Sequence, residues 1–304
     1  MAYRTTGFIP RWVVALALLA ALSACLPFNG PTPTPSPPVK TPTLTPLPAT
    51  QTPLTPSTIS VGNTSTPDAP ACSGQVLNGI INSALLAKPM TYHVYLPPCY
   101  FDETETHYPT LFLLHGQTYN EDQWIRLGVP ATMDRLIAAG QIPPFIIVFP
   151  YDYSNLQPPQ YHFEDVFMGA LIPQIDATYR TIPDAAHRAI GGLSRGAAWA
   201  LHLGIHHPDV FGAIGAHSPA IFYSDAASLP LILRDIPAEQ LPRIYIDFGD
   251  ADAQMQNDLD FKKLLDDYNI PYEWHENIGF HDETYWAAHV QAYLTWYAQG
   301  WIKK

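Results

Sequence analysis

The stretch Gly192-Leu193-Ser194-Arg195-Gly196 decides how this chain is interpreted, because it reads G-x-S-x-G between an apolar run and an expected helix. The run covers 188–191 and the helix is expected over 197–207. A serine at such a sharp strand-to-helix turn is held in strained backbone geometry with its Oγ exposed, and neighbouring glycines tolerate the turn. Ser194 is therefore a candidate nucleophile, and its partners are sought in the rest of the sequence.

Short apolar or β-branched runs alternate with helical patterns in the part of the chain that follows residue 72. This alternation predicts an α/β fold with a mostly parallel central sheet of about eight strands and helices on both faces. Strands are expected over 75–80, 91–96, 110–115, 145–150, 188–191, 213–216, 243–248 and 272–277. Helices are expected over 131–139, 163–179, 197–207, 257–268 and 283–298. Ligands of such sheets bind at the carboxyl ends of the strands.

A nucleophilic serine needs a base, and the base needs a carboxylate that orients it. Downstream of Ser194, one expected strand runs into Gly249-Asp250-Ala251-Asp252, and the next runs into Gly279-Phe280-His281. The order Ser, Asp, His is that of the α/β-hydrolase arrangement. We predict His281 as the base and Asp252 as its orienting acid. Asp250 and Asp247 compete for the acid role, although Asp247 lies within the strand and Asp250 is placed to brace the loop.

The tetrahedral intermediate of acyl transfer needs backbone N–H donors. One donor is expected from Arg195, which follows the nucleophile, and the other from the loop after the third expected strand. In that loop Gly116 lets the backbone approach the site and Gln117 supplies the N–H. His115 is the alternative base, but we interpret it as a structural residue at the end of the strand.

Several segments of this chain resemble the Putative esterase family of α/β-hydrolases, which includes esterase D-like enzymes, feruloyl and acetylxylan esterases, enterochelin esterases and mycolyltransferases. These segments are Tyr108 to Gly116, Leu171 to Thr181, Gly191 to Gly196, His207 to Phe211, Ser218 to Ala220 and Gly279 to Trp286. The resemblance extends over about residues 92–297 and implies an α/β-hydrolase fold with a serine esterase site. It assigns the catalytic roles to Ser194, Asp252 and His281, and the oxyanion hole to Gln117 and Arg195.

The sequence departs from the family pattern at two positions. Arg195 stands where the family often has Met, and Ala170 stands where a Glu is common. The side chain of Arg195 could reach an anionic group of a substrate or pair with a surface carboxylate. The absence of the Glu weakens the transfer of substrate specificity from the resemblance.

Four further residues are expected to shape the pocket: Trp124 near the oxyanion loop, His217 after a strand, and Tyr161 and His162 in the loop after the fourth expected strand. For Trp124 and His217, packing is the alternative that we favour. His202 and His206 have a metal-ligand spacing but lack the glutamate of an H-E-x-x-H motif, so we interpret them as histidines of a helix surface. No metal and no cofactor is expected.

The N-terminal residues have the pattern of a secretory signal peptide. Residues 1–25 have a basic start, an apolar run and the ending Leu22-Ser23-Ala24-Cys25, which resembles the lipobox of bacterial lipoproteins. The resemblance implies cleavage before Cys25, acylation of that residue and attachment to the lipid bilayer, with the protein facing outward from the cell membrane. The alternative is an ordinary signal peptide with a chance cysteine.

Residues 26–71 carry thirteen of the 32 prolines and almost nothing to bury, so we expect a disordered linker there. Residues 72–304 then form one catalytic domain. Export places this domain in an oxidising compartment, where a disulfide between Cys72 and Cys99 is expected. Two free thiols are the alternative.

The formal net charge of −12 argues against nucleic acid as a partner, because phosphate binding needs patches of Lys and Arg. The leading hypothesis is an exported, membrane-tethered serine esterase that acts through an acyl-enzyme intermediate on a small aryl ester or an acylated polysaccharide. The alternatives are an acyltransferase of the mycolyltransferase type and a non-catalytic envelope binding module on the same fold.

Overall fold

The structure is a computed structural model, and it describes residues 72–302. The expected signal peptide, Cys25 and the expected linker lie outside the described residues. No helix among residues 72–302 is long and apolar enough to cross a bilayer.

An eight-stranded sheet forms the centre of the molecule, with the strand order β1-β2-β4-β3-β5-β6-β7-β8. The strands are β1 (Gln75–Ile81), β2 (Met90–Leu96), β3 (Thr110–Leu114), β4 (Ile146–Pro150), β5 (Arg188–Leu193), β6 (Ala213–His217), β7 (Arg243–Gly249) and β8 (Glu273–Asn277). The first two strands form a hairpin whose second strand pairs antiparallel with β4, and all other pairs are parallel. This confirms the predicted α/β fold with its mostly parallel sheet.

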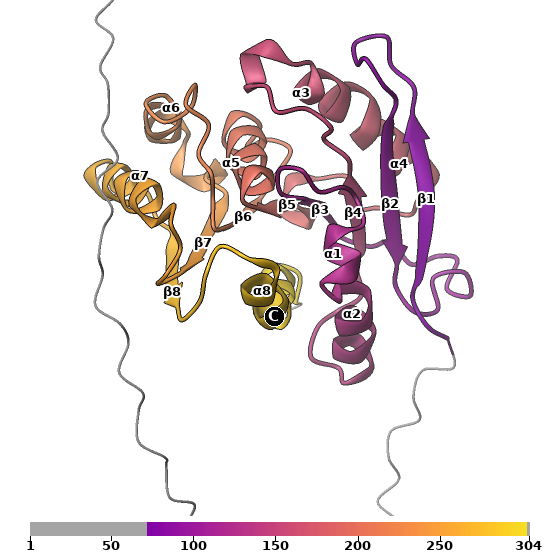
Figure 1. Cartoon of the computed structure of the whole chain (residues 1–304). Coiled ribbons are helices and arrows are strands. Elements are labelled where there is room, and N and C mark those ends of the chain that lie inside the picture. Colours follow the sequence, from indigo (N-terminus) through magenta and orange to yellow (C-terminus); the bar gives the residue numbers. More distant parts are fainter. Residues whose placement is uncertain (1–71, 303–304) are drawn as a thin grey trace, which may run out of the picture. The chain divides into compact units, whose positions relative to one another are not determined.

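Within residues 72–302, eight α-helices cover the two faces of this sheet (Figure 1). They are α1 (Gln123–Arg126), α2 (Val129–Ala138), α3 (Phe163–Val166), α4 (Ile172–Thr178), α5 (Arg195–His206), α6 (Leu229–Asp235), α7 (Met255–Asp267) and α8 (Glu283–Gln299). One apolar core joins the sheet to α3, α4, α5, α6 and α7. A second core joins the opposite face to α1, α2 and α8. Both faces are therefore dry, which explains why the central strands are apolar throughout.

The helix expected over 163–179 is three consecutive pieces. Between α3 and α4 the chain makes a π-helical turn over Phe167–Leu171, and Pro173 stands in the first turn of α4. Because proline has no N–H, the regular ladder of hydrogen bonds is interrupted one turn before it. The segment is thus helical, as predicted, but it is not one regular helix.

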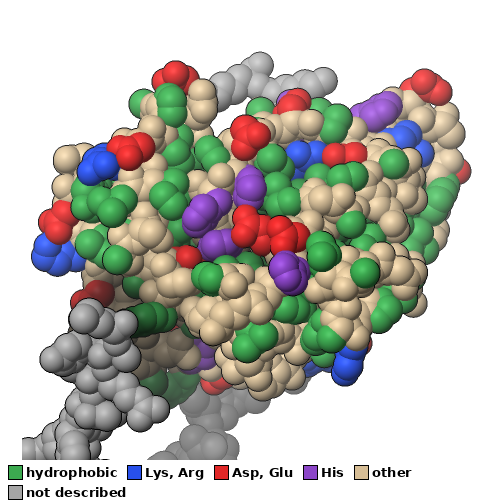
Figure 2. Space-filling model, turned by 90° about the horizontal axis from the view of Figure 1, so that it is seen from above, with side chains coloured by type: hydrophobic (Ala, Val, Ile, Leu, Met, Phe, Trp, Pro, Cys, Tyr) green, Lys and Arg blue, Asp and Glu red, His purple; other side chains and the backbone are tan. Residues whose placement is uncertain are grey.

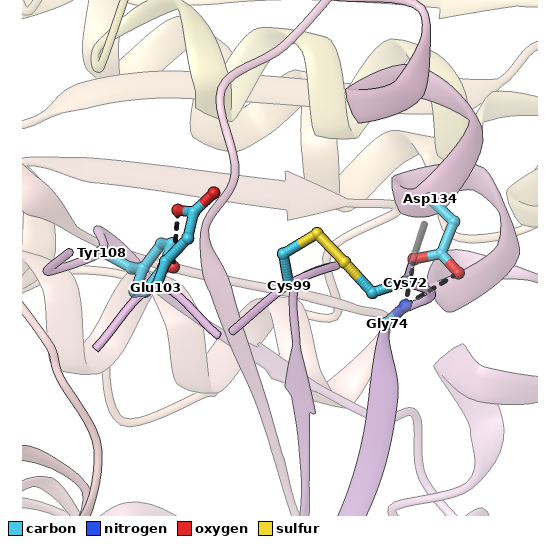
Figure 3. Close-up of a disulfide and its surroundings, with 6 residues drawn as sticks. All are labelled: Cys72, Gly74, Cys99, Glu103, Tyr108 and Asp134. Carbon is cyan, nitrogen blue, oxygen red and sulfur yellow. Dashed lines mark hydrogen bonds between the residues drawn. A yellow bond between two sulfur atoms is a disulfide. The ribbon is translucent and has the colours of Figure 1, made fainter. Parts of the chain in front are cut away.

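A disulfide joins Cys72, just before β1, to Cys99, just after β2 (Figure 3). The predicted pairing is present. Nearby, the N–H of Gly74 donates hydrogen bonds of 3.2 Å to both carboxylate oxygens of Asp134 on α2. These bonds and the disulfide attach the start of the domain to its body.

The surface reflects the acidic composition. Seen from above, it shows few Lys and Arg side chains, and acidic and histidine side chains gather near the middle of this face (Figure 2). Such a face offers little attraction to a polyanion.

Candidate active site

Ser194 lies between the end of β5 and the first residue of α5, with a backbone φ of 53° and ψ of −119°. A positive φ at a residue that carries a side chain is strained, and such strain is typical of functional turns. The turn can close because Gly196 has no side chain. A Cβ at Gly196 would collide with the carbonyl oxygens of Leu114 and His115. The close approach of α5 to the end of β3 therefore depends on this glycine.

Ser194, His281 and Asp252 converge although they are far apart in the sequence. The Oγ of Ser194 lies 2.9 Å from Nε2 of His281, and Nδ1 of the same ring lies 2.7 Å from Oδ2 of Asp252. Because an ionised carboxylate can only accept, Nδ1 carries the ring proton and Nε2 is free to accept the proton of the hydroxyl. This is the arrangement that lets a histidine deprotonate a serine.

Asp252 is placed to remain ionised. Its side chain is fully buried, and burial by itself raises the pKa of a carboxyl group. Hydrogen bonds from His281 and from the backbone N–H of Gln254, the latter at 2.7 Å, outweigh burial and hold the pKa of Asp252 below its usual range. The acid can therefore stabilise a positive charge on the imidazole.

The two competing aspartates occupy other positions. Asp250 accepts a hydrogen bond of 3.0 Å from the N–H of Gly279, so it braces the loop that carries His281. Asp247 is fully buried, and its carboxylate is bound by His217 at 2.6 Å and by the hydroxyls of Tyr285 and Tyr293 at 2.7 Å. Of the three aspartates, the structure brings Asp252 to the imidazole of His281.

The N–H groups of Gln117 and Arg195 donate to no acceptor within the described part of the chain. Arg195 is the first residue of α5, where backbone N–H groups have no partner inside the helix. The loop before Gln117 is held by Gln123, whose Oε1 accepts a 2.8 Å hydrogen bond from the N–H of Gly116. Gln123 in turn donates to Glu283 at 3.1 Å.

The supporting role of Gln123 was not predicted from the sequence. It lies on α1, a helix of four residues that is too short to show a periodic pattern.

A pocket of about 370 Å³ opens beside the triad. It is lined by Gly116, Gln117, Tyr119, Leu193, Ser194, His281, Asp282, Glu283, Thr284 and Trp286. Trp286 donates a 3.1 Å hydrogen bond to Ser218 and lies edge-on to the ring of His281. Its ring is buried and forms a wall of this pocket.

None of the four residues predicted for the pocket lines it. Trp124 is buried beneath the oxyanion loop and donates to the carbonyl of Leu114 at 2.8 Å. His217 is fully buried because Asp247, its partner in register on β7, holds its ring. Tyr161 stacks on Phe163 and packs against the core, while the exposed His162 pairs with Asp165, so both lie outside the pocket.

His202 is a further correction, because it is buried rather than on a helix surface. Its Nδ1 lies 2.9 Å from Asp225 and its Nε2 lies 3.1 Å from Glu164. Burial lowers the pKa of His202, but hydrogen bonds to the two carboxylates more than compensate and raise it to about 9. Glu164 also binds His207 at 2.8 Å, so this cluster fastens α3 to α5.

Asp258, in the first turn of α7, is a buried carboxyl group whose two oxygens have no hydrogen-bond partner within residues 72–302. Burial raises its pKa to about 8, and the nearby charges of Asp252 and Asp247 act in the same direction. Asp258 is therefore largely protonated at neutral pH.

Comparison with known proteins agrees with this geometry. The model of the Putative esterase family matches residues 83–297, which include the nucleophile turn and the loop of His281. The chain belongs to the Putative esterase family. The family is one of serine hydrolases that act on carboxylic esters.

Two proteins similar to this chain are named as feruloyl or ferulic acid esterases. An endo-1,4-beta-xylanase/feruloyl esterase of Xylanibacter ruminicola is 33% identical over 160 residues, which are 49% of this chain and 22% of that protein. The chain thus matches about a fifth of the length of that relative. A solved ferulic acid esterase is 27% identical with a TM-score of 0.68, and the match covers 75% of this chain and 99% of that one.

A more distant structure shares the fold. An S-formylglutathione hydrolase from Staphylococcus aureus is 20% identical with a TM-score of 0.63, and the match covers 75% of this chain and 97% of that one.

Proposed function

We propose that this chain is an exported serine esterase that hydrolyses feruloyl-type esters, in which an aromatic acid is esterified to carbohydrate, through an acyl-enzyme intermediate. The observation that carries the proposal is the chain of hydrogen bonds from Ser194 through His281 to Asp252. The names of the xylanase/feruloyl esterase relative and of the similar ferulic acid esterase support the choice of substrate.

The reaction follows from this geometry. The Oγ of Ser194 attacks the ester carbonyl while Nε2 of His281 takes the hydroxyl proton, and the resulting oxyanion lies against the N–H groups of Gln117 and Arg195. The imidazolium, stabilised by Asp252, gives the proton to the departing alkoxide. A water molecule then attacks the acyl-serine and passes a proton to Nε2. This proton returns to the Oγ of Ser194 as the acid leaves, and the free hydroxyl is restored.

Labelling and substitution test the chemistry. A fluorophosphonate probe is expected to label wild-type protein at Ser194 and to leave Ser194→Ala unlabelled. Methyl ferulate turnover is expected to fall by about 10⁴-fold in Asp252→Asn, because the imidazole loses its correct tautomer. Asp250→Asn serves as the matched control and is expected to retain most activity. A folded wild-type protein that neither reacts with the probe nor hydrolyses any ester would refute the proposal.

The same assay separates hydrolysis from acyl transfer. With xylan fragments or trehalose added as acceptors, a hydrolase releases ferulic acid in proportion to the ester consumed. New acylated sugar in place of free acid would indicate a transferase.

We also propose that Cys25 is acylated and tethers the enzyme to the outer side of the cell membrane, as the lipobox-like ending before it suggests. The test is the mass of the N-terminal peptide of the protein expressed in a bacterial host. An S-diacylglyceryl cysteine at position 25, with or without an acyl chain on its amine, is expected. The protein should also fractionate with membranes, and Cys25→Ser should abolish this membrane association. An unmodified N-terminus at another residue would contradict the tether.

A further inference from the structure

Asp152 is a buried charged residue in the loop after β4, and it holds two other loops of the site. One of its carboxylate oxygens accepts hydrogen bonds of 2.8 Å from Nε of Arg195 and from the indole N–H of Trp199. Its backbone N–H donates a 2.9 Å hydrogen bond to Nε2 of His115. The segments of His115 and of Arg195 are the two that carry the N–H groups of the oxyanion hole.

The bond to Asp152 fixes the tautomer of His115. Because a backbone N–H donates to Nε2, this nitrogen is unprotonated, and Nδ1 carries the proton and donates to the carbonyl of Gly116 at 2.7 Å. Burial also lowers the pKa of His115, so the neutral ring is the stable form. His115 is thus an obligate bridge between the loop after β4 and the oxyanion loop.

The carbonyl of Gly116 and the N–H of Gln117 belong to one peptide group. This group is planar, and in a trans peptide the two bonds point in opposite directions. The hydrogen bond from His115 to the carbonyl therefore fixes the direction in which the Gln117 N–H points. The bond also polarises the peptide group, which strengthens its N–H as a donor.

The other donor is held through its own side chain. The guanidinium of Arg195 is buried, and besides Asp152 it binds the carbonyl of Leu156 at 2.8 Å. Anchoring this side chain restrains the first residue of α5, whose backbone N–H is the second oxyanion donor.

We propose that Asp152 is a positioning residue for both oxyanion donors: its carboxylate holds the side chain of Arg195, and its backbone N–H binds His115, which orients the peptide group of Gln117. This inference rests on the proposed function. It assigns the buried arginine, which stands where a methionine is common in the family, to the alignment of the transition state rather than to the binding of an anionic substrate.

The test compares Asp152→Ala with Asp165→Ala, a control at an exposed acidic residue of α3 that pairs with His162. Asp152→Ala removes the carboxylate that holds Arg195 and Trp199 and leaves the backbone bond to His115, so it tests the Arg195 donor. Removal of a whole oxyanion donor lowers kcat by about 10²–10³-fold, so a misaligned donor is expected to lower kcat by about 10- to 100-fold. The KM for a soluble aryl ester is expected to change by less than about threefold, since the ground-state ester makes little use of these donors. Affinity for a phenylboronic acid, which forms a tetrahedral adduct on serine, should fall in proportion to kcat.

A conservative variant and a double variant distinguish a role in aligning the oxyanion donors from a role in folding alone. Asp152→Asn keeps an acceptor oxygen for Arg195 and Trp199, so it is expected to recover part of the lost kcat. Arg195→Met is expected to lower kcat by about tenfold, and the double variant with Asp152→Ala should lose less than the product of the two single losses. If Asp152→Ala does not fold, Asp152→Asn and Arg195→Met carry the same comparison.

Two outcomes would overturn the inference while leaving the proposed function intact. One is a folded Asp152→Ala enzyme with wild-type kcat and wild-type boronate affinity. The other is a loss confined to KM or to thermal stability, which would make the network structural only. Failure of the proposed function is distinguishable, because the wild-type enzyme would then neither react with the fluorophosphonate nor turn over any ester.

Discussion

Replacement of Asp258 by asparagine is expected to stabilise the protein, increasingly so as the pH rises from 5 to 7. Both oxygens of this carboxyl are buried without a partner in the described part of the chain, next to two other carboxylates. Ionisation of Asp258 in the folded protein is therefore opposed, while the unfolded chain ionises it freely. Asparagine resembles the protonated acid in shape and never ionises.

The magnitude follows from the displacement of the pKa of Asp258 from 3.8 to about 8. Between these two values the folded protein holds a proton that the unfolded chain has released, so the free energy of unfolding falls as the pH rises. One proton corresponds to about 1.4 kcal/mol per pH unit. From pH 5 to pH 7, the advantage of Asp258→Asn over wild type should grow by about 3 kcal/mol.

Urea unfolding of the wild type and of the variant, followed by tryptophan fluorescence at pH 5, 6 and 7, measures this difference. Asp260→Asn, at an exposed position on the same helix, is the matched control for exchanging an aspartate of α7 for asparagine. A constant difference between Asp258→Asn and wild type over this range would refute the reasoning. It would mean that Asp258 ionises in the folded protein as readily as in the unfolded chain.

Three further predictions concern stability. Substitution of both Cys72 and Cys99 by serine should lower the free energy of unfolding by about 3 kcal/mol, because the disulfide closes a loop with a sequence separation of 27. Denaturant unfolding measures this loss, and an unchanged unfolding midpoint would count against the prediction. His202 has a pKa raised to about 9, so its ion pairs stabilise the protein fully below pH 6.5, and up to about 3 kcal/mol is lost as the pH rises through 9. His202→Gln should remove this part of the alkaline destabilisation, and an equally steep loss in the variant would disprove it. Gly196→Ala should abolish both folding and probe labelling in a soluble-expression assay, because its Cβ collides with the carbonyl of Leu114, and a folded, reactive variant would contradict the tight turn.

The arrangement of strands was predictable because each strand carries its own signal. A run such as Phe145 to Phe149 is apolar at every position, and only a strand covered on both faces accounts for that over so short a length. The turn around Ser194 was predictable for a related reason, since its glycines and the flanking elements are contiguous in the sequence. The short helices α1 and α6 escaped detection because four and seven residues are too few to establish a helical period.

The lining of the pocket depends on contacts between distant segments, which leave no local pattern. His217 follows a strand and so was considered for the pocket. The residue beside it on β7 is Asp247, and two tyrosines of α8 complete the cage around that carboxylate. Similarly, the surface assignment of His202 was wrong because Glu164 and Asp225 come from other segments and cover the ring. Burial of a polar residue is set by its partners, which helical spacing alone does not reveal.

The residues of the catalytic triad follow strands that lie at different places in the sheet and therefore differ in their resistance to local unfolding. β5, which delivers Ser194, has four strands on one side and three on the other, whereas the loop of His281 follows β8 at the margin of the sheet. Marginal strands open at lower free energy than central ones. Gentle heating should therefore separate the imidazole of His281 from Ser194 while the turn that holds Ser194 is still folded. The enzyme should then lose its activity well below the melting temperature of the protein, and it should regain this activity on cooling.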